Sequence, residues 1–464
     1  MSDIRPLIKV SPFVLALLMT LPVNGHAQTY TFVEAVKTAL ESNPEMGVSK
    51  ARISQAESAL GKANASNLPQ INFSLTGSYS NNPLNVFGMK LQQSQATIGD
   101  FGVTEPGAQG PNAATYQPQS LNNPDPHTDL NTRFEMLVPV YNGGKVDSFK
   151  QQARSMIEAA QSGDVAVRQY LTFAVYQAYE AVHAARSFIT VAEQAQKTAQ
   201  EFVRTTENLV KQGVIVRSEL LSAKANASAA QVALTKAKGQ EQIALDSLRI
   251  LMGLSPTDSI DVAERMDIRL PASDLPALLE HALKNNPQLG AQRKEAASTA
   301  FAIDAAKADE KPSFNMVVRQ EWNDDGIGFE ASSYTVAGVM AWKVTDFGVT
   351  ENTIKMARAA AEQKQAEAAS MANKVKFELM TAWHRLQIAD EQVISSQIVV
   401  QQAEEAQVLV GKRYENGVAT FTELLASQTQ LDKARAELEA AKFEVNVQKA
   451  TLRLNAGSMD INQL

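Results

Sequence analysis

Few side chains in this sequence have the spacing that catalysis or metal binding requires. The histidines show no paired metal-ligand spacing, and no Ser/His/Asp order stands out. The segment Asn142-Gly-Gly-Lys145 lacks the Gly-x4-Gly-Lys-Ser/Thr pattern of a phosphate loop, so we interpret its glycines as easing a backbone turn. We therefore expect no enzyme activity, no cofactor and no metal site. The five histidines are His26, His127, His183, His281 and His384.

The remaining chemistry is that of two carboxylates in related surroundings. Glu219 and Glu423 lie 204 positions apart, and each follows a glycine by six positions. A carboxylate in the first turn of a helix is stabilised by the helix dipole by roughly 0.3–1 kcal/mol, which by itself explains both residues. If several chains meet around one axis, Glu423 instead forms a ring that favours cations. The residues leave both interpretations open.

The turns before these carboxylates reverse the direction of long helical segments. Gly213 and Gly417 stand where a helix C-terminus needs a residue in the left-handed conformation. Ser218 and Thr422 are placed to cap the helices that follow. We therefore expect two helical hairpins, over about 145–253 and about 349–456.

The positions of glycine and proline show that the chain repeats itself. Gly213 and Gly417 lie 204 positions apart, whereas Pro69 and Pro312 lie 243 positions apart. The first copy therefore carries 39 extra residues, and we assign them to a long external loop over 81–129, which is rich in Asn, Gln, Gly and Pro. A duplicated unit restricts the fold to a pseudo-symmetric arrangement.

Four segments alternate between apolar and polar residues, with the period of β-strands. Each is about ten residues long, the length of a tilted strand that crosses an outer membrane. A half-buried sheet in a soluble protein has the same period and is the alternative. The predicted strands span about 70–80, 131–141, 313–322 and 333–344.

Composition excludes several classes of function. The net charge of −7 gives no basic surface for nucleic acid. The absence of cysteine excludes disulfides, thiolate metal sites and a lipid anchor on an N-terminal cysteine. Arg5 and Lys9, an apolar stretch and Gly25-His26-Ala27 predict a signal peptide over 1–27, cleaved before Gln28. We expect an exported protein without a transmembrane helix.

These features divide the chain into two copies of one unit. The expected fold is mainly α-helical with a membrane β-barrel portion. Four membrane strands cannot close a barrel alone, because open strand edges are not tolerated in lipid. Several chains must therefore share a barrel, and three would give twelve strands with room for a pore. The expected parts are a signal peptide (1–27), a first repeat (28–253), a linker (254–273), a second repeat (274–457) and a tail (458–464).

The sequence resembles the TolC-type outer membrane efflux proteins over nearly the whole mature chain. The resemblance rests on the duplicated unit, on Pro139-Val-Tyr-Asn-Gly-Gly-Lys145, and on Lys412-Arg-Tyr-Glu-Asn-Gly-Val418 followed by Glu423-Leu-Leu425 and Gln428. It implies a homotrimer with a twelve-stranded barrel in outer membrane lipid and a long α-helical barrel in the periplasm. Its implied role is the exit duct for an inner-membrane pump, proton-driven or ATP-driven, joined by a periplasmic adaptor.

The resemblance also implies roles for residues at the hairpin turns. Glu423 matches an acidic ring and Tyr414 a gate tyrosine, and we place Glu219 in the same constriction. Two further positions of the family's pattern depart from it here, as Ala419 and Ala426. The expected adaptor contacts are Gly213, Val214, Gly417 and Val418. The alternatives are a periplasmic adaptor, which carries a single hairpin, and a structural coiled-coil envelope protein.

Overall fold

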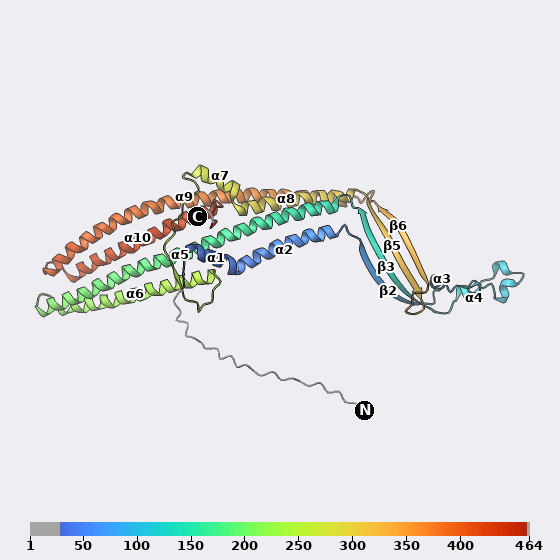
Figure 1. Ribbon diagram of the computed structural model, residues 1–464, viewed down its shortest axis with the longest axis horizontal. Helices are drawn as coiled ribbons and strands as arrows, with labels where there is room; N and C mark the ends of the chain where they lie inside the picture. The colour runs from blue at the N-terminus through green and yellow to red at the C-terminus, as the bar shows by residue number, and fades with distance from the viewer. Residues whose placement is uncertain (1–27, 462–464) are drawn as a thin grey trace, which may run out of the picture.

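The computed structural model describes residues 28–461 as an elongated molecule with a sheet toward one end and two helical hairpins at the other (Figure 1). The predicted signal peptide lies outside these residues. Among the described residues, no helix is both long and apolar enough to cross a membrane. The principal elements of the first half are α1 (Phe32–Ser42), α2 (Pro44–Ala65), β2 (Gln70–Ser80), β3 (His127–Tyr141), α5 (Lys145–Lys211) and α6 (Arg217–Leu251). Those of the second half are α7 (Leu275–Asn285), α8 (Pro287–Lys307), β5 (Ser313–Asp324), β6 (Ser332–Ala341), α9 (Val349–Glu415) and α10 (Phe421–Asn455).

The two halves have long helices of matching length. Both α5 and α9 have 67 residues, and both α6 and α10 have 35. No proline interrupts any of the four, and Pro would break the i to i−4 ladder in a helix interior. In each half the second hairpin helix runs back beside the first, in the pairs α5–α6 and α9–α10 (Figure 1).

In both halves, a glycine just after the second hairpin helix packs closely against the backbone between the two preceding short helices. Gly253 and Gly457 have φ of +67° and +73°, and an added Cβ would lie 2.8 Å from the Ser42 oxygen and 2.6 Å from the Asn285 oxygen, respectively. Neither position accepts a side chain without backbone movement. The Asn43 amide also donates to Leu251 O at 2.9 Å, and the Asn286 amide to Asn455 O at 3.0 Å. Each short helix pair thus docks at one defined position.

The four predicted strands form one antiparallel sheet, in the order β2-β3-β5-β6. Four of their approximate predicted bounds differ from the structure, one of them by a single residue, since β6 begins at Ser332. β3 begins at His127 because β2 pairs with it as far as Ser80↔His127, and β5 continues to Asp324. β6 ends at Ala341, since its partner strand starts at Ser313, immediately after a proline that has no N–H to donate.

The register places apolar side chains on one face of this sheet and polar ones on the other. Phe73, Phe134 and Tyr334 lie on one row, with Gln320 between the last two, and Ile71 begins the next apolar row. This face is open to solvent in the single chain, with Ile71 71% and Tyr334 80% exposed. The opposite face carries Asn, Ser, Thr, Arg and Glu along most of its length, and an apolar row of Leu137, Val317 and Ala337 at the end nearest the helices.

The segment expected to be a long loop contains short helices. These are α3 (Pro83–Gln92), α4 (Gln119–Asn122) and three 3-10 turns. Glu105 organises the outer part, accepting from the Tyr116 hydroxyl at 2.5 Å and from the backbone N–H groups of Gln119 and Ser120 at 3.0 and 2.9 Å. Sequence composition indicated a loop because Asn, Gly and Pro are frequent, but this carboxylate satisfies several donors and holds the segment compact.

The linker between the halves contains a strand that the sequence did not indicate. β4 (Ile260–Val262) pairs in parallel with β1 (Gln28–Tyr30), and both contribute to the largest core cluster of the described residues. The Tyr179 hydroxyl on α5 donates to the Glu264 oxygen at 3.2 Å. Arg186 binds Glu241 of α6 at 2.8 Å and also contacts Asp261 of the linker. The linker is therefore bound across the middle of the first hairpin.

Candidate functional site

The two hairpin turns lie together at the end of the molecule that is remote from the sheet (Figure 1). At each turn a glycine takes the left-handed conformation, with φ of +75° at Gly213 and +71° at Gly417. Val214 N donates to Leu209 O at 2.9 Å, and Val418 N to Arg413 O at 2.8 Å. The predicted role of both glycines as helix terminators is confirmed, and the two backbones close in the same way.

The predicted helix caps were wrong. α6 begins at Arg217, and its N-cap Val216 has no side-chain hydrogen bond to offer. α10 begins at Phe421, and its N-cap is Thr420, whose hydroxyl accepts from Glu423 N at 3.2 Å. Ser218 and Thr422 lie inside the helices, each two residues beyond the observed cap. Only the second tip therefore has the side-chain cap that normally stabilises a helix start.

Tyr414, the residue matched to a gate tyrosine, joins the two hairpins. Its ring is 1% exposed, and its hydroxyl lies 2.8 Å from the hydroxyl of Thr206 on the other hairpin. It packs in a cluster with Phe421, Leu424 and Ala223, with 6.0 Å between the Tyr414 and Phe421 ring centroids. Burial raises the pKa of Tyr414, while the hydrogen bond with Thr206 lowers it. The tyrosine is therefore a neutral, buried tether between hairpins.

The two carboxylates of the predicted constriction occupy different environments. Glu423 is about half exposed, and its Oε2 lies 3.8 Å from the Arg413 guanidinium. One carboxylate oxygen of Glu219 is buried and has no hydrogen-bond partner in the described residues. Glu219 also acts on the neighbouring Tyr414, whose pKa its negative charge raises. The two carboxylates therefore differ in burial and in their partners.

Apolar side chains project from both tips. Val418 is 69% exposed and Val216 is 64% exposed, and Val214 is also exposed. Val214 contacts the second tip, because a Cβ on Gly417 would lie 3.4 Å from its Cγ1. The sequence indicated Val214 and Val418 as exposed tip residues but did not indicate Val216. The expected cap was Ser218, whereas Val216 is the residue that precedes α6.

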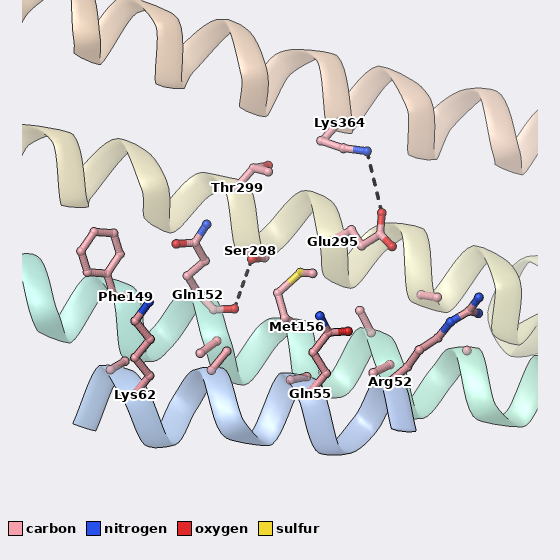
Figure 2. A pocket seen from close by; sticks show the side chains of 18 of the residues that line it. Arg52, Gln55, Lys62, Phe149, Gln152, Met156, Glu295, Ser298, Thr299 and Lys364 are labelled. Atoms are coloured by element: carbon pink, nitrogen blue, oxygen red, sulfur yellow. Dashed lines mark hydrogen bonds and ion pairs between the residues drawn. The ribbon is translucent and has the colours of Figure 1, made fainter. Parts of the chain in front are cut away.

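Sequence reasoning also missed Thr206 and a groove near the sheet. Thr206 gave no signal, since a threonine within a 67-residue helix has no special spacing. The groove measures about 1070 Å³ and runs along α5 between α2 and α8, with α9 beside it (Figure 2). Small residues line much of it, and the Ser298 hydroxyl donates to Gln152 O at 3.1 Å across one wall. The residues that line this groove come from α2, α5, α8 and α9, which lie side by side in one layer.

Comparisons with known proteins identify the class to which this fold and these tips belong. The family model of outer membrane efflux proteins matches residues 35–254 and again 278–458. The chain belongs to the outer membrane efflux protein family and is therefore a protein of the outer membrane. Within residues 28–461, no group of three or more His, Cys, Asp or Glu side chains is arranged to hold a metal ion.

Particular relatives and structures agree with this assignment. The alkaline protease secretion protein AprF of Pseudomonas aeruginosa is 21% identical over 309 residues, which span 63% of this chain and 62% of that protein. The crystal structure of the CmeC outer membrane channel of Campylobacter jejuni matches with a TM-score of 0.73 at 15% identity, over 93% of this chain and 87% of that one. The outer membrane protein VceC of Vibrio cholerae matches with a TM-score of 0.73 at 17% identity, over 92% and 96% of the two chains.

Proposed function

We propose that this protein is the outer membrane exit duct of a tripartite efflux or type I secretion system. It would conduct substrates passively from an inner-membrane pump and a periplasmic adaptor to the cell exterior. The observation that carries the proposal is the sheet, whose exposed apolar face is suited to lipid and whose opposite face is polar. Family membership supports the same conclusion.

Closure of the sheet requires further copies of the chain. β2 and β6 are the outer strands of the four-stranded sheet, and neither has a second partner in the described chain. Backbone groups left unpaired within lipid cost several kcal/mol each. We infer that β6 of one copy pairs with β2 of the next, so that three copies close a twelve-stranded barrel. Twelve strands leave an open lumen, whereas eight leave space only for side chains.

The layer of helices would extend the wall of the strand barrel from the membrane into the periplasm. α2, α5, α8 and α9 lie side by side, with the succession of contacts α2–α5, α5–α8 and α8–α9. The buried residues of this layer include many alanines, which allow helix axes to approach closely. We infer that the units 28–253 and 274–457 are copies, so that three chains form a six-fold pseudo-symmetric tube.

The tips would form the periplasmic gate. In a trimer Glu423 occurs three times around the axis and supplies a cation-favouring ring. The hydrogen bond between Tyr414 and Thr206 holds the second hairpin against the first and favours the closed tip. Glu219 lies beside this tether and adds negative charge at the same level.

The adaptor would bind the apolar ends of both turns. Gly213 and Gly417 keep the turns compact, while Val214 and Val418 with Val216 offer exposed apolar surface. Exposed apolar side chains that gather at one end of a molecule can mark a protein-binding site. AprF is named for protease secretion, so a polypeptide is one candidate cargo, and small molecules are the other.

The experiment that tests the proposal starts from the outer membrane fraction. We expect a heat-modifiable trimer that conducts ions when it is inserted into planar bilayers. A periplasmic adaptor or a coiled-coil envelope protein would instead appear in the soluble or peripheral fraction and would give no conductance. Conductance by a monomer, or a stable trimer that fails to conduct both as the parent and as the Tyr414→Phe variant, would overturn the duct.

A further inference from the structure

The polar face of the sheet carries the same short motif on its two central strands. β3 contains Arg133-Phe-Glu135, and β5 contains Arg319-Gln-Glu321. Residues two apart on a strand point to the same face, so all four charges lie on the side opposite the apolar rows. Phe134 and Gln320, the middle residues, belong to the other face.

The antiparallel register converts these motifs into two reciprocal ion pairs. Arg133 stands opposite Glu321, and Glu135 stands opposite Arg319. Arg133 Nε lies 2.5 Å from Glu321 Oε1, and Arg319 binds Glu135 Oε2 through Nε at 3.0 Å and through a terminal nitrogen at 2.7 Å. Each arginine therefore has one carboxylate partner, and the group of four has no net charge.

On the four strands that the structure describes, no other charged side chain lies at the level of this group. The flanking positions are Asn72 and Ser74 on β2 and Ser333 and Thr335 on β6. Toward the external end, Asp129 is buried and accepts a hydrogen bond from the Gln93 amide at 3.0 Å. The four paired side chains are between 18% and 39% exposed, so a solute that passes this face meets them directly.

We propose that Arg133, Glu135, Arg319 and Glu321 form a charge-compensated belt that removes ion selectivity from the strand section of the duct. This inference rests on the proposed function, because the polar face lines a lumen only when three chains close a barrel. The belt leaves charge selectivity to the tips and allows solutes of either sign to leave through the barrel. Removal of one partner exposes three like charges around the lumen.

The size of the effect follows from the dimensions of a twelve-stranded barrel. Strands spaced about 4.8 Å apart and tilted about 40° give a radius of about 12 Å. Three uncompensated charges at that distance from the axis, screened by 0.1 M salt, favour one sign of ion and disfavour the other, and so change the ratio of cation to anion permeability by about threefold. The change grows to about tenfold at 0.01 M salt, where screening is weaker.

The test uses full-length trimers in planar bilayers under a salt gradient. Glu321→Gln should shift the reversal potential toward anion selectivity by about threefold in permeability ratio at 0.1 M salt, and Arg133→Gln should shift it the other way. The double variant Arg133→Gln/Glu321→Gln, which is again neutral, should return the ratio to that of the parent. Asp258→Asn removes an exposed carboxylate from the linker and serves as the matched control, with no expected shift.

The outcomes separate the belt from other roles. If the single variants conduct with the parent's reversal potential, the belt is overturned while the duct stands. If no variant and no parent trimer conducts, the proposed function itself has failed. If Glu321→Gln does not assemble, Glu135→Gln tests the same prediction at the second pair. A purely structural role in strand register would lower trimer stability in both single variants without opposite shifts in selectivity.

Discussion

The two hairpin tips have the same backbone but are held by different side chains. Both turn through a glycine with positive φ, and both make the same backbone hydrogen bond across the turn. The second tip adds the Thr420 cap, and its Tyr414 and Phe421 are buried in the cluster between the hairpins. The first tip starts its return helix at an uncapped Val216. The two turns therefore share one backbone conformation, whereas the side-chain cap and the buried aromatic side chains are found at the second tip.

The largest effect is expected from bulky substitution of the turn glycines. Gly417→Val places a β-branched side chain at φ of +71°, which L residues rarely adopt, and its Cβ would approach Val214. We expect efflux to be abolished, measured as loss of growth in the presence of a pump substrate, while trimers still assemble. Gly213→Val, where the Cβ meets nothing within 4 Å, should have a smaller effect. Loss of trimers in both variants would show a folding role instead.

The next largest effect is expected at the tether between the hairpins. Tyr414→Phe removes the hydrogen bond and leaves the buried Thr206 hydroxyl without its partner, at a cost of about 2 kcal/mol. That cost raises the population of open tips about thirtyfold, which single-channel conductance should record. Thr206→Val should give a similar increase, and the double variant, which leaves no buried hydroxyl unpaired, should open less than either single variant. Additive effects of the two changes would show that the tether is not a single interaction.

A smaller effect is expected from the cap that only the second tip possesses. Thr420→Ala removes the acceptor for Glu423 N and should destabilise the start of α10 by about 1 kcal/mol. Amide hydrogen exchange in the first turn of α10 should become about fivefold faster. Val216→Ala at the equivalent position of the first tip is the matched control and should leave exchange in α6 nearly unchanged. Equal acceleration at both tips would remove the proposed difference in fastening.

The smallest effect is expected at the carboxylate ring. Glu423→Ala should lower the cation selectivity of the reconstituted pore by about twofold, since the carboxylates are partly exposed and screened. Glu219→Ala should change selectivity less, because one of its carboxylate oxygens is buried beside Tyr414. An unchanged reversal potential for Glu423→Ala would leave the helix dipole as the only role of this residue.

Long-range regularities of this fold were predictable from the sequence, and local side-chain partners were not. The absence of proline and the glycines at the turns indicated α5 and α9, and alternation indicated the sheet strands. β4 was missed because a three-residue strand has too few residues to show a period. The caps were misplaced by two residues, since Thr420 and Thr422 are chemically identical candidates.

The candidate site divides in the same way. Gly213 and Gly417 could be predicted from the sequence, because few residues other than glycine tolerate a positive φ at a helix end. Tyr414 came from a resemblance, and its partner Thr206 is set by how two hairpins pack, which spacing along the chain does not encode. The outer part of the 81–129 segment is held by Glu105 and its partners up to fifteen residues away, and the inner part by pairs such as Lys90 with Asp100.

The central claim is that β6 of one chain pairs with β2 of the next to close a three-chain barrel, and cross-linking tests it most directly. The native chain has no cysteine, so Asn72→Cys on β2 can be combined in turn with cysteine at Ser333, Thr335 or Ala337 on the polar face of β6. One pair should oxidise readily when its Cα atoms approach within about 4.4–6.8 Å. We predict a covalent trimer on a non-reducing gel for the pair in register. Cross-links only within one chain, or only dimers, for every pair would contradict the barrel.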